Sequence, residues 1–371
     1  MGARPNYMKM APLVHALKSA PALPGPTLVH TGQHYDLAMN EKLFADLHMP
    51  TPDINLNVGS GSHAVQTAEI MRRFESVLDA AKVACVVVVG DVNSTLACAL
   101  VAAKKSIPVV HVESGLRSFD RRMPEEINRV LTDQLSDLLY TTERSAHSNL
   151  TREGIHPSKI HFVGNLMIDS LLSQLSRAVP VGQILAQAGF SGSAAAGWQR
   201  YAVLTLHRPS NVDDPEALQS LLTVLRQAST NIPVIWPMHP RTRANIEHFE
   251  LSHLLDAPTI LTLPPQGYLE MLGLMSTATL VMTDSGGIQE ETTALGIPCM
   301  TLRENTERPI TVEEGTNIVV GRDPDAIMST LRDICATGGK RGRIPELWDG
   351  HAAERIAHHL ADWLASQHLN L

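Results

Sequence analysis

The chain has 371 residues, of which 44% are hydrophobic and 18% are charged, and this length favours two domains over a single core. Its formal net charge of −8 argues against nucleic acid as a partner, and no apolar run approaches the roughly 20 residues of a membrane helix. The four cysteines, Cys85, Cys98, Cys299 and Cys335, stand far apart without metal-type spacing, so we expect reduced thiols in a cytoplasmic protein.

Short apolar runs rich in β-branched residues alternate with helical patterns along the whole chain. The runs are continuously hydrophobic, which is typical of parallel strands covered on both faces. In chain order, the predicted strands are 27–30, 85–89, 109–112, 138–141, 160–163, 202–206, 234–237, 259–261, 279–283 and 299–302. The clearest helices are 9–19, 94–105, 125–135, 215–228 and 351–366. This order predicts an α/β protein with two Rossmann-like, doubly wound domains.

The domain boundary is expected near Gly164 and Asn165, which gives domains over residues 1–165 and 166–350. The first helix follows a glycine-containing turn that begins at Gly2, and such a turn normally follows a strand. No residues before Gly2 can form that strand in this sequence. We therefore expect the N-terminal domain to lack its first strand.

The strand 279–283 ends in Asp284, Ser285, Gly286 and Gly287, and a helix can follow. A helix start offers unpaired backbone N–H groups and a positive dipole end, so this turn predicts an anion site with phosphate as the usual ligand. Glycines let the ligand approach the backbone, and a serine adds a hydroxyl donor. The alternative is a tight turn whose glycines serve sterics only.

Other polar residues follow predicted strands in the same way. Asp91 and Glu113 do so in the first half, and His207, His239 and Asp284 do so in the second. A single aspartate at such a place is more often a helix cap. Their recurrence at the carboxyl ends of strands in both halves predicts a ligand site in a cleft between the domains.

Three cations and one carboxylate have weaker local signals. Arg4, Lys9 and Arg308 would each be read alone as surface charge, but beside an anion turn they become candidates for phosphate neutralisation. Glu125 follows Pro124 at a helix start, where an acidic residue is favourable for the dipole alone.

At these motifs the chain resembles the non-hydrolysing UDP-N-acetylglucosamine 2-epimerases. The matching strings occur in order over nearly the whole chain. They are GARPNYMK (2–9), HTGQHYD (30–36), GDVNST (90–95), HVESGLR (111–117), PEEINR (124–129), TLHRP (205–209), DSGGIQEE (284–291) and ERP (307–309).

The resemblance implies a fold similar to the GT-B glycosyltransferases, with UDP held mainly by the C-terminal domain. It implies a final helix that returns residues 351–371 to the N-terminal domain, and a homodimer. It also implies inversion at C2 of UDP-GlcNAc to give UDP-ManNAc, without nicotinamide or metal. UDP is eliminated to leave 2-acetamidoglucal and then adds back, with a proton delivered to the other face.

The resemblance also implies roles for individual residues. Asp91, Glu113 and Glu125 match the catalytic carboxylates, with base and acid unassigned among them. The positions that stabilise the leaving diphosphate are matched by His207, Arg4, Lys9 and Arg308. The remaining substrate-binding positions are Ser285, Gly286 and Gly287 at the phosphates, Glu291 at the ribose, Gln266 by the uracil, and Met271 where an aromatic residue often packs.

Some stretches depart from the usual family pattern. Residues 33–36 lack the cation of a Gln-His-Arg stretch that binds an activating second UDP-GlcNAc in many members. Asn6 and Tyr7 replace a common Glu-Ala pair, which could mark a subgroup acting on a UDP-diacetamido-uronate. Because family members carry about eight residues before the glycine turn, we expect the physiological protein to begin upstream. A GT-B glycosyltransferase and an inactive UDP-sugar-binding protein are the alternative functions.

Overall fold

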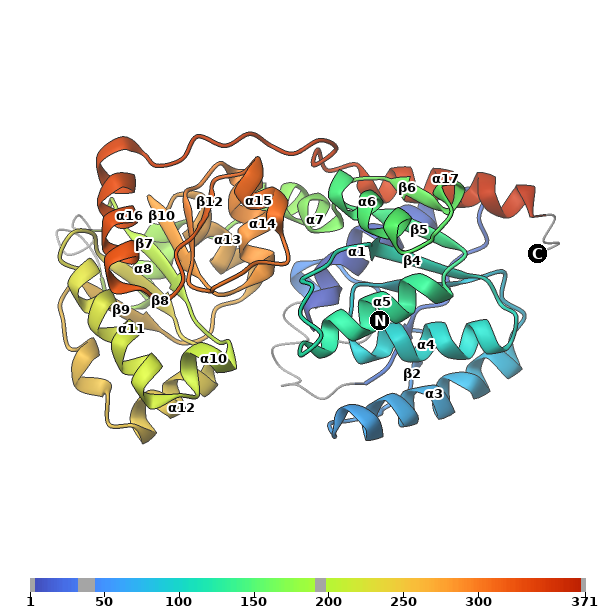
Figure 1. Ribbon diagram of the computed structural model, residues 1–371, viewed down its shortest axis with the longest axis horizontal. Helices are drawn as coiled ribbons and strands as arrows, with labels where there is room; N and C mark the ends of the chain where they lie inside the picture. Colours follow the sequence, from blue (N-terminus) through green and yellow to red (C-terminus); the bar gives the residue numbers. More distant parts are fainter. Residues whose placement is uncertain (1–3, 33–43, 191–197, 368–371) are drawn as a thin grey trace. The chain divides into compact units, whose positions relative to one another are not determined.

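The computed structural model describes residues 4–32, 44–190 and 198–367 of an α/β chain (Figure 1). The chain divides into two compact units, called here unit 1 and unit 2. Unit 1 combines Met1–Ser173 with Glu346–Leu371, and unit 2 is Gln174–Pro345. Every strand pair in both units is parallel, as the continuous apolar runs predict. None of the described helices combines the length and the apolar character needed to cross a membrane.

Unit 2 is built on one six-stranded sheet in the order β12-β11-β10-β7-β8-β9. The five strands expected from the sequence are present, and the three-residue β12 was not predicted. Their bounds are β7 (Ala202–Thr205), β8 (Val234–Pro237), β9 (Ile260–Leu263), β10 (Leu280–Thr283), β11 (Cys299–Thr301) and β12 (Asn317–Val319).

The order of these strands has a reversal point. The chain places β8 and β9 on one side of β7, and then β10, β11 and β12 on its other side. Doubly wound sheets bind their ligands outside the carboxyl ends of the strands at such a reversal. In unit 2 the reversal lies between β7 and β10, whose residues Thr205 and Thr283 are register partners.

Helices cover both faces of this sheet, so consecutive strand residues enter different cores. Ala202 and Leu204 of β7 belong to a core with side chains of α11 and α16, whereas Val203 belongs to a core with side chains of α8 and α13. The helical segments of unit 2 are η2 (Leu175–Arg177), α8 (Val181–Gln187), α10 (Pro209–Val212), α11 (Pro215–Ala228), α12 (Pro240–His248), η3 (Ser252–Leu255), α13 (Tyr268–Ser276), α14 (Gly286–Leu295), α15 (Pro309–Glu313) and α16 (Pro324–Thr337).

Unit 1 contains two separate parallel sheets. A four-stranded sheet has the order β3-β4-β5-β6, and a two-stranded sheet pairs β1 with β2. The strands are β1 (Val29–His30), β2 (Ile54–Asn55), β3 (Val86–Val89), β4 (Val109–Ser114), β5 (Leu138–Thr141) and β6 (Ile160–Phe162). The two-residue β2 was not predicted, since it is too short to show a pattern.

The helices of unit 1 flank its strands, with α1 and α17 on one side of β4 and α3 and α4 on the other (Figure 1). Their bounds are α1 (Arg4–Ser19), α3 (His63–Ala80), α4 (Asn93–Lys104), α5 (Pro124–Leu135), α6 (Arg144–Arg152), η1 (Pro157–Lys159), α7 (Leu166–Gln174) and α17 (Ala352–Ser366). The first helix begins at Arg4, five residues before the predicted start. A proline in the first turn is tolerated there because its missing N–H would have no helical acceptor.

The chain returns to unit 1 after unit 2, and α17 is the helix predicted over 351–366. The buried carboxylate of Asp169 in α7 caps its start by accepting the backbone N–H groups of Ala352 and Ala353 at 3.1 and 2.7 Å. The Trp348 indole N–H donates to the Thr142 carbonyl oxygen at 3.1 Å. These bonds join the start of α17 and the residues just before it to α7 and to the end of β5, which lie far earlier in the sequence.

Candidate functional site

The turn after β10 places a buried carboxylate beside the start of α14. Asp284 is fully buried, and α14 begins at Gly286 with Ser285 as its N-cap residue. The turn therefore lies at the reversal point of the unit 2 sheet. The strand-to-helix turn predicted from the sequence is confirmed.

Asp284 ties this turn to the neighbouring strand end after β7. Its oxygens accept the backbone N–H groups of His207 and Arg208 at 2.9–3.1 Å and the Asn211 side-chain amide at 3.1 Å. His207 Nδ1 also lies 2.9 Å from Asp284 Oδ1. Burial alone would raise the pKa of Asp284, but the His207 contact and the backbone donors lower it below its ordinary value. Asp284 is thus an anion that orients the partly exposed His207 ring through Nδ1.

The first turn of α14 has the features of an anion site. Ser285 makes no side-chain cap bond to the helix, so its hydroxyl does not occupy the first-turn amides. Gly286 is buried, and Gly287 is partly exposed. A Cβ on Gly286 would lie 2.7 Å from Glu307 Oε1, so this position requires glycine for close packing. The turn can donate backbone N–H groups and one hydroxyl to an anion.

Opposite charges alternate around this glycine. Glu307 is buried and pairs with Arg303 at 2.8 Å and with Arg208 at 3.4 Å. Burial opposes ionisation, yet the facing arginines lower the pKa of Glu307 to about 2. Arg308, predicted to contact phosphate, is buried with Nε 2.9 Å from Glu290 Oε1. The start of α14 is therefore surrounded by fixed charges of both signs.

Glu291, expected at the ribose, is buried one turn into α14. Burial raises its pKa to about 8, with Glu290 adding to the effect and Tyr268 opposing it. Within the described ranges, Glu291 Oε1 and the Tyr268 hydroxyl have no hydrogen-bond partner of ordinary geometry. The two groups interact with each other. Buried polar atoms that lack hydrogen bonds of ordinary geometry are uncommon, so this pair is a candidate site for a ligand with hydroxyl groups.

The two other residues expected at the nucleotide lie close together in the chain. Gln266 precedes α13 and is partly exposed, with its side-chain amide donating to the Pro264 carbonyl oxygen at 2.9 Å. Met271 lies in α13 and packs against a core of unit 2. His239 caps α12 after β8, with its ring centroid 6.2 Å from that of His207.

In unit 1, Asp91 follows β3 and Gly90. Gly90 has φ +72°, and a Cβ there would lie 2.9 Å from the Asn6 side chain, so glycine is needed for both reasons. Asp91 Oδ2 lies 2.5 Å from a terminal guanidinium nitrogen of Arg129. Arg129 also contacts Glu126 at 2.9 Å. Arg129 was missed from the sequence as a partner of Asp91, because the two are 38 positions apart.

Glu113 lies near the end of β4, where the regular strand geometry is disturbed. Its φ is +67°, unusual for a residue with a side chain, and the β4–β5 register shifts between Val112 and Ser114. The Glu113 carboxylate forms a buried salt bridge with Lys9 of α1. The structure thus places Lys9 beside a carboxylate of the same unit, and this pairing was not predicted. Strained backbone of this kind concentrates at functional sites.

The adjacent glutamates at the start of α5 have different environments. Glu126 is buried and accepts the backbone N–H groups of Ser118 and Phe119 at 2.9 Å, as well as Arg129. Glu125 is only partly buried. Glu126 is therefore the residue that anchors the preceding loop, and Glu125 remains available for another role.

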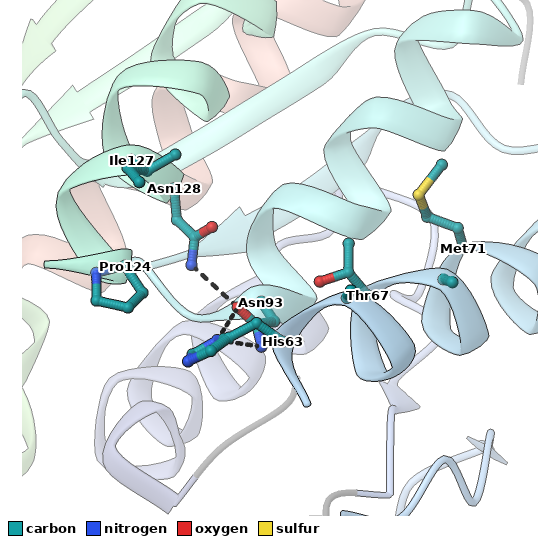
Figure 2. Close-up of a pocket in the computed structure, with 9 residues that line it drawn as sticks. His63, Thr67, Met71, Asn93, Pro124, Ile127 and Asn128 are labelled. Carbon is teal, nitrogen blue, oxygen red and sulfur yellow. Dashed lines mark hydrogen bonds between the residues drawn. The ribbon is translucent and has the colours of Figure 1, made fainter. Parts of the chain in front are cut away.

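Side chains of α3, α4 and α5 surround an open cavity beside the Asp91 turn (Figure 2). The Asn128 amide donates to the Asp91 carbonyl oxygen at 2.9 Å and lies 3.4 Å from Asn93 Oδ1. Asn93 Nδ2 in turn lies 3.1 Å from His63 Nδ1. These contacts fix the backbone that carries Asp91 relative to α5.

A buried charged network lies behind both strand ends. His111 has Nδ1 2.6 Å from Asp133 and Nε2 2.8 Å from the Gly90 carbonyl oxygen. Burial favours protonation of Asp133, but His111 and Arg117 lower its pKa below the ordinary value. His111, left unassigned from the sequence, thus supports the turn that leads to Asp91.

Two expectations fall outside the described part of the chain. Arg4 is the first residue of α1, but its side chain is not described, and residues 33–36 lie within the undescribed stretch 33–43. Within the described ranges, no group of His, Cys, Asp and Glu side chains is arranged to hold a metal ion.

A doubly wound parallel sheet with a glycine-containing helix start at its reversal point defines the nucleotide-binding class of α/β folds. The family model described as UDP-N-acetylglucosamine 2-epimerase matches residues 16–361. The chain belongs to this family of epimerases, and it is an enzyme of the isomerase type.

Individual relatives cover almost the whole chain. A Methanocaldococcus jannaschii protein named UDP-N-acetylglucosamine 2-epimerase is 42% identical over 96% of each chain. A Pseudomonas aeruginosa protein named UDP-2,3-diacetamido-2,3-dideoxy-D-glucuronate 2-epimerase is 41% identical over 97% of this chain and 98% of the relative. The crystal structure of the M. jannaschii UDP-GlcNAc 2-epimerase in complex with UDP-GlcNAc and UDP matches with a TM-score of 0.86, at 41% identity, over 97% of this chain and 98% of that one.

Proposed function

We propose that the enzyme interconverts UDP-GlcNAc and UDP-ManNAc by eliminating UDP to 2-acetamidoglucal and adding it back. The observation that carries this proposal is the match, over 97% of the chain, to an epimerase structure that holds UDP-GlcNAc and UDP. The positions of the site residues at strand ends in both units support it.

In this proposal the α14 turn binds the diphosphate. The first-turn N–H groups at Gly286 and Gly287 and the Ser285 hydroxyl are suitable donors, because neither a cap bond nor a bulky side chain occupies the helix start. Arg308, which is buried beside Glu290, would contribute positive charge. The uracil would contact Gln266 near Met271.

Glu291 would accept hydrogen bonds from the ribose hydroxyl groups. Its Oε1 atom and the Tyr268 hydroxyl are buried without partners of ordinary geometry among the described residues. Its pKa is raised to about 8 chiefly by burial, so the free site favours the protonated acid near neutral pH. Hydroxyl donors from a ribose would stabilise the carboxylate.

Three carboxylates of unit 1 would exchange the C2 proton. Asp91 follows β3 and Gly90, Glu113 lies near the end of β4, and Glu125 lies in the first turn of α5. The C2 proton is poorly acidic, so a positioned base must remove it as the C1–O bond breaks, and a second group must return a proton to the other face. Within this trio, Glu113 forms a buried salt bridge with Lys9.

His207 would stabilise the departing β-phosphate. Because Asp284 contacts Nδ1, the Nε2 atom is left to face a ligand. A ring held in place by the buried Asp284 carboxylate is positioned to meet that growing negative charge.

An exchange experiment tests the reaction. Incubation with UDP-GlcNAc in D₂O should give UDP-ManNAc and deuterium at C2 of both sugars. NMR spectra of the sugars measure both changes. A glycosyltransferase would leave the C2 hydrogen untouched without an acceptor, and a binding protein would leave the sugar unchanged. Either of these results would overturn the proposal.

A second candidate substrate is UDP-2,3-diacetamido-2,3-dideoxy-D-glucuronate. The P. aeruginosa relative named for it is 41% identical to this chain, against 42% for the UDP-GlcNAc relative, so identity does not separate the two. Parallel D₂O reactions with both sugars decide between them. The substrate with the higher kcat/KM is the one the enzyme prefers.

We also propose that the enzyme is a cytoplasmic homodimer that supplies a sugar nucleotide for polysaccharide synthesis. Support for the dimer comes from apolar side chains of α3 and α5 that face solvent: Val65, Ile127 and Leu131 are 58%, 45% and 46% exposed. Exposed apolar patches often mark protein interfaces. Sedimentation equilibrium should give twice the chain mass of 40.4 kDa, and a monomer mass would contradict the dimer.

A further inference from the structure

One buried carboxylate, that of Asp133, is bonded toward both strand ends of unit 1 that carry proposed catalytic residues. Asp133 is fully buried and lies in α5, about two turns after Glu125. Its Oδ1 atom lies 2.6 Å from His111 Nδ1, and its Oδ2 atom accepts the Gly115 backbone N–H at 3.1 Å and the Arg117 guanidinium at 2.7 Å. Both oxygens have partners, so these contacts fix the orientation of the carboxylate.

The first arm of this network leads to Asp91. His111 Nε2 lies 2.8 Å from the carbonyl oxygen of Gly90, the residue just before Asp91. The His111 ring therefore spans the distance between Asp133 and the point where the chain leaves β3. Gly90 makes this turn with φ +72°, and the position of its carbonyl group sets the direction of the backbone that follows.

The second arm leads to Glu113. Glu113 and Gly115 have φ +67° and +78°, and a residue with a side chain is strained at such an angle. Strain of this kind persists only where the surrounding structure holds the backbone. The bond from the Gly115 N–H to Asp133 holds one side of this turn, and the Asn149 amide holds the other by donating to the Gly115 carbonyl oxygen at 3.0 Å.

The third connection is the helix itself, because α5 carries both Asp133 and Glu125. The same helix contacts the Asp91 turn a second time, where the Asn128 amide donates to the Asp91 carbonyl oxygen at 2.9 Å. The three segments that carry the proposed catalytic carboxylates are thus joined to one another through Asp133.

The alternative role for this network is stability alone, and the location of its contacts argues against that role. Contacts that only fastened α5 to the sheet could lie anywhere along β4. Those of Asp133 lie instead at the two turns next to Asp91 and Glu113. Positions matter there, because a misplacement of about 1 Å in a reacting group can lower a rate by about 100-fold.

We propose that Asp133 is a positioning residue that holds Asp91, Glu113 and Glu125 in a fixed relation to one another. This relation lets the C2 proton leave one face of the sugar and return to the other. Asp133 acts indirectly, through His111 and through the backbone at Gly115. The inference rests on the proposed epimerisation.

Two substitutions at Asp133 separate position from charge. Asp133→Ala removes both arms of the network. Asp133→Asn can keep both arms, because the amide oxygen accepts from Gly115 and the amide N–H donates to His111 Nδ1, which leaves Nε2 as a donor to Gly90. The kcat for deuterium entry at C2 and the Kd for UDP are measured at a temperature where circular dichroism shows that every variant is folded.

Asp133→Ala should lower kcat by about 10- to 100-fold and leave the Kd for UDP within about twofold of the parent, because the proposed UDP site lies in unit 2. Asp133→Asn should keep kcat within about threefold of the parent, since the geometry is retained. The matched control is Glu153→Gln, which changes the other carboxylate bonded to Arg117. Glu153 is 29% exposed and contacts neither turn through Arg117, so kcat should be unchanged.

Full exchange by folded Asp133→Ala would overturn the positioning role and leave the proposed reaction standing. Equal losses in Asp133→Ala and Asp133→Asn would also overturn it, because charge and not position would then be responsible. A parent chain that exchanged no C2 hydrogen would overturn the proposed reaction, and this inference with it.

If Asp133→Ala does not fold, His111→Leu takes its place. This change cuts the arm to Gly90 and leaves Asp133 bonded to Gly115 and Arg117. It should lower kcat by about tenfold or more with the Kd for UDP retained. Full exchange by this variant would overturn the proposal.

Discussion

The catalytic role proposed for Asp91 can be tested by a single isosteric change. Asp91→Asn keeps the shape of the side chain and an acceptor for Arg129, which lies 2.5 Å away, but it removes the carboxylate. We expect deuterium exchange at C2 to fall by about 100-fold or more, with the Kd for UDP within about twofold of the parent because no UDP group is assigned to Asp91.

The matched control is Asp79→Asn, which removes an exposed partner of Lys105 on unit 1. This variant should keep full exchange activity, because exposed ion pairs contribute little. If Asp91→Asn lost UDP binding and stability together with exchange, Asp91 would be a structural cap and not a catalytic group.

Glu291 makes the stability of the enzyme depend on pH. Its pKa is about 8 in the folded enzyme against 4.5 for the ordinary group, so the folded state holds a proton that the unfolded chain releases. The stability that this proton provides is complete below pH 4.5 and is lost as pH rises through 8. Glu291→Gln cannot ionise, so we expect its free energy of unfolding to exceed the parent's at pH 8 by on the order of 3 kcal/mol.

Urea unfolding at pH 5 and pH 8 measures this difference in the absence of UDP. Glu304→Gln, at a side chain that is 72% exposed, serves as the control and should follow the parent at both values. If the stability of Glu291→Gln changed with pH as the parent's does, the Glu291 carboxyl would not be the source of this pH dependence.

At the scale of elements, helix α13 is held close to the segment before α8. A Cβ on Gly273 would lie 1.8 Å from the Val179 carbonyl oxygen, whereas one on Gly182 in α8 would meet nothing within 4 Å. Gly273→Ala must displace backbone and should cost about 2 kcal/mol or more. Gly182→Ala lowers the conformational entropy of the unfolded chain, so it should stabilise the folded protein by about 0.5 kcal/mol. Equal effects in thermal unfolding would mean that α13 adjusts freely.

The sequence predicted elements well where a local pattern was long enough. Ten apolar runs were correctly assigned as strands, because parallel strands buried on both faces leave a continuous signal. The short β2 and β12 were missed, since two or three residues carry no periodicity. Asp91, His207 and Asp284 follow strands as predicted, whereas β4 extends to Ser114 and therefore contains Glu113.

The partners of those residues could not be predicted. Asp284 contacts His207 from 77 positions away, and Arg129 reaches Asp91 across 38. Such pairs depend on how strands are ordered in the sheet, which no local pattern encodes. Glu125 and Glu126 look equivalent in sequence and differ only because Glu126 accepts N–H groups of the preceding loop.

At the scale of the whole molecule, the chain enters and leaves unit 2 once. Residues 174–345 form an uninterrupted segment with a complete six-stranded sheet and helices on both faces, and it contains Asp284, the α14 turn and Glu291. Because a domain with its own core can fold alone, we expect residues 174–345 to fold in isolation and to bind UDP. At UDP one hundred times above its Kd, the free energy of unfolding should rise by about 2.7 kcal/mol. Calorimetry measures the stability of the segment and its response to UDP. Ser285→Ala, which removes a hydroxyl that makes no cap bond to α14, is the control that should fold and bind UDP more weakly. A segment that folds but gains nothing from UDP would place the nucleotide site outside unit 2.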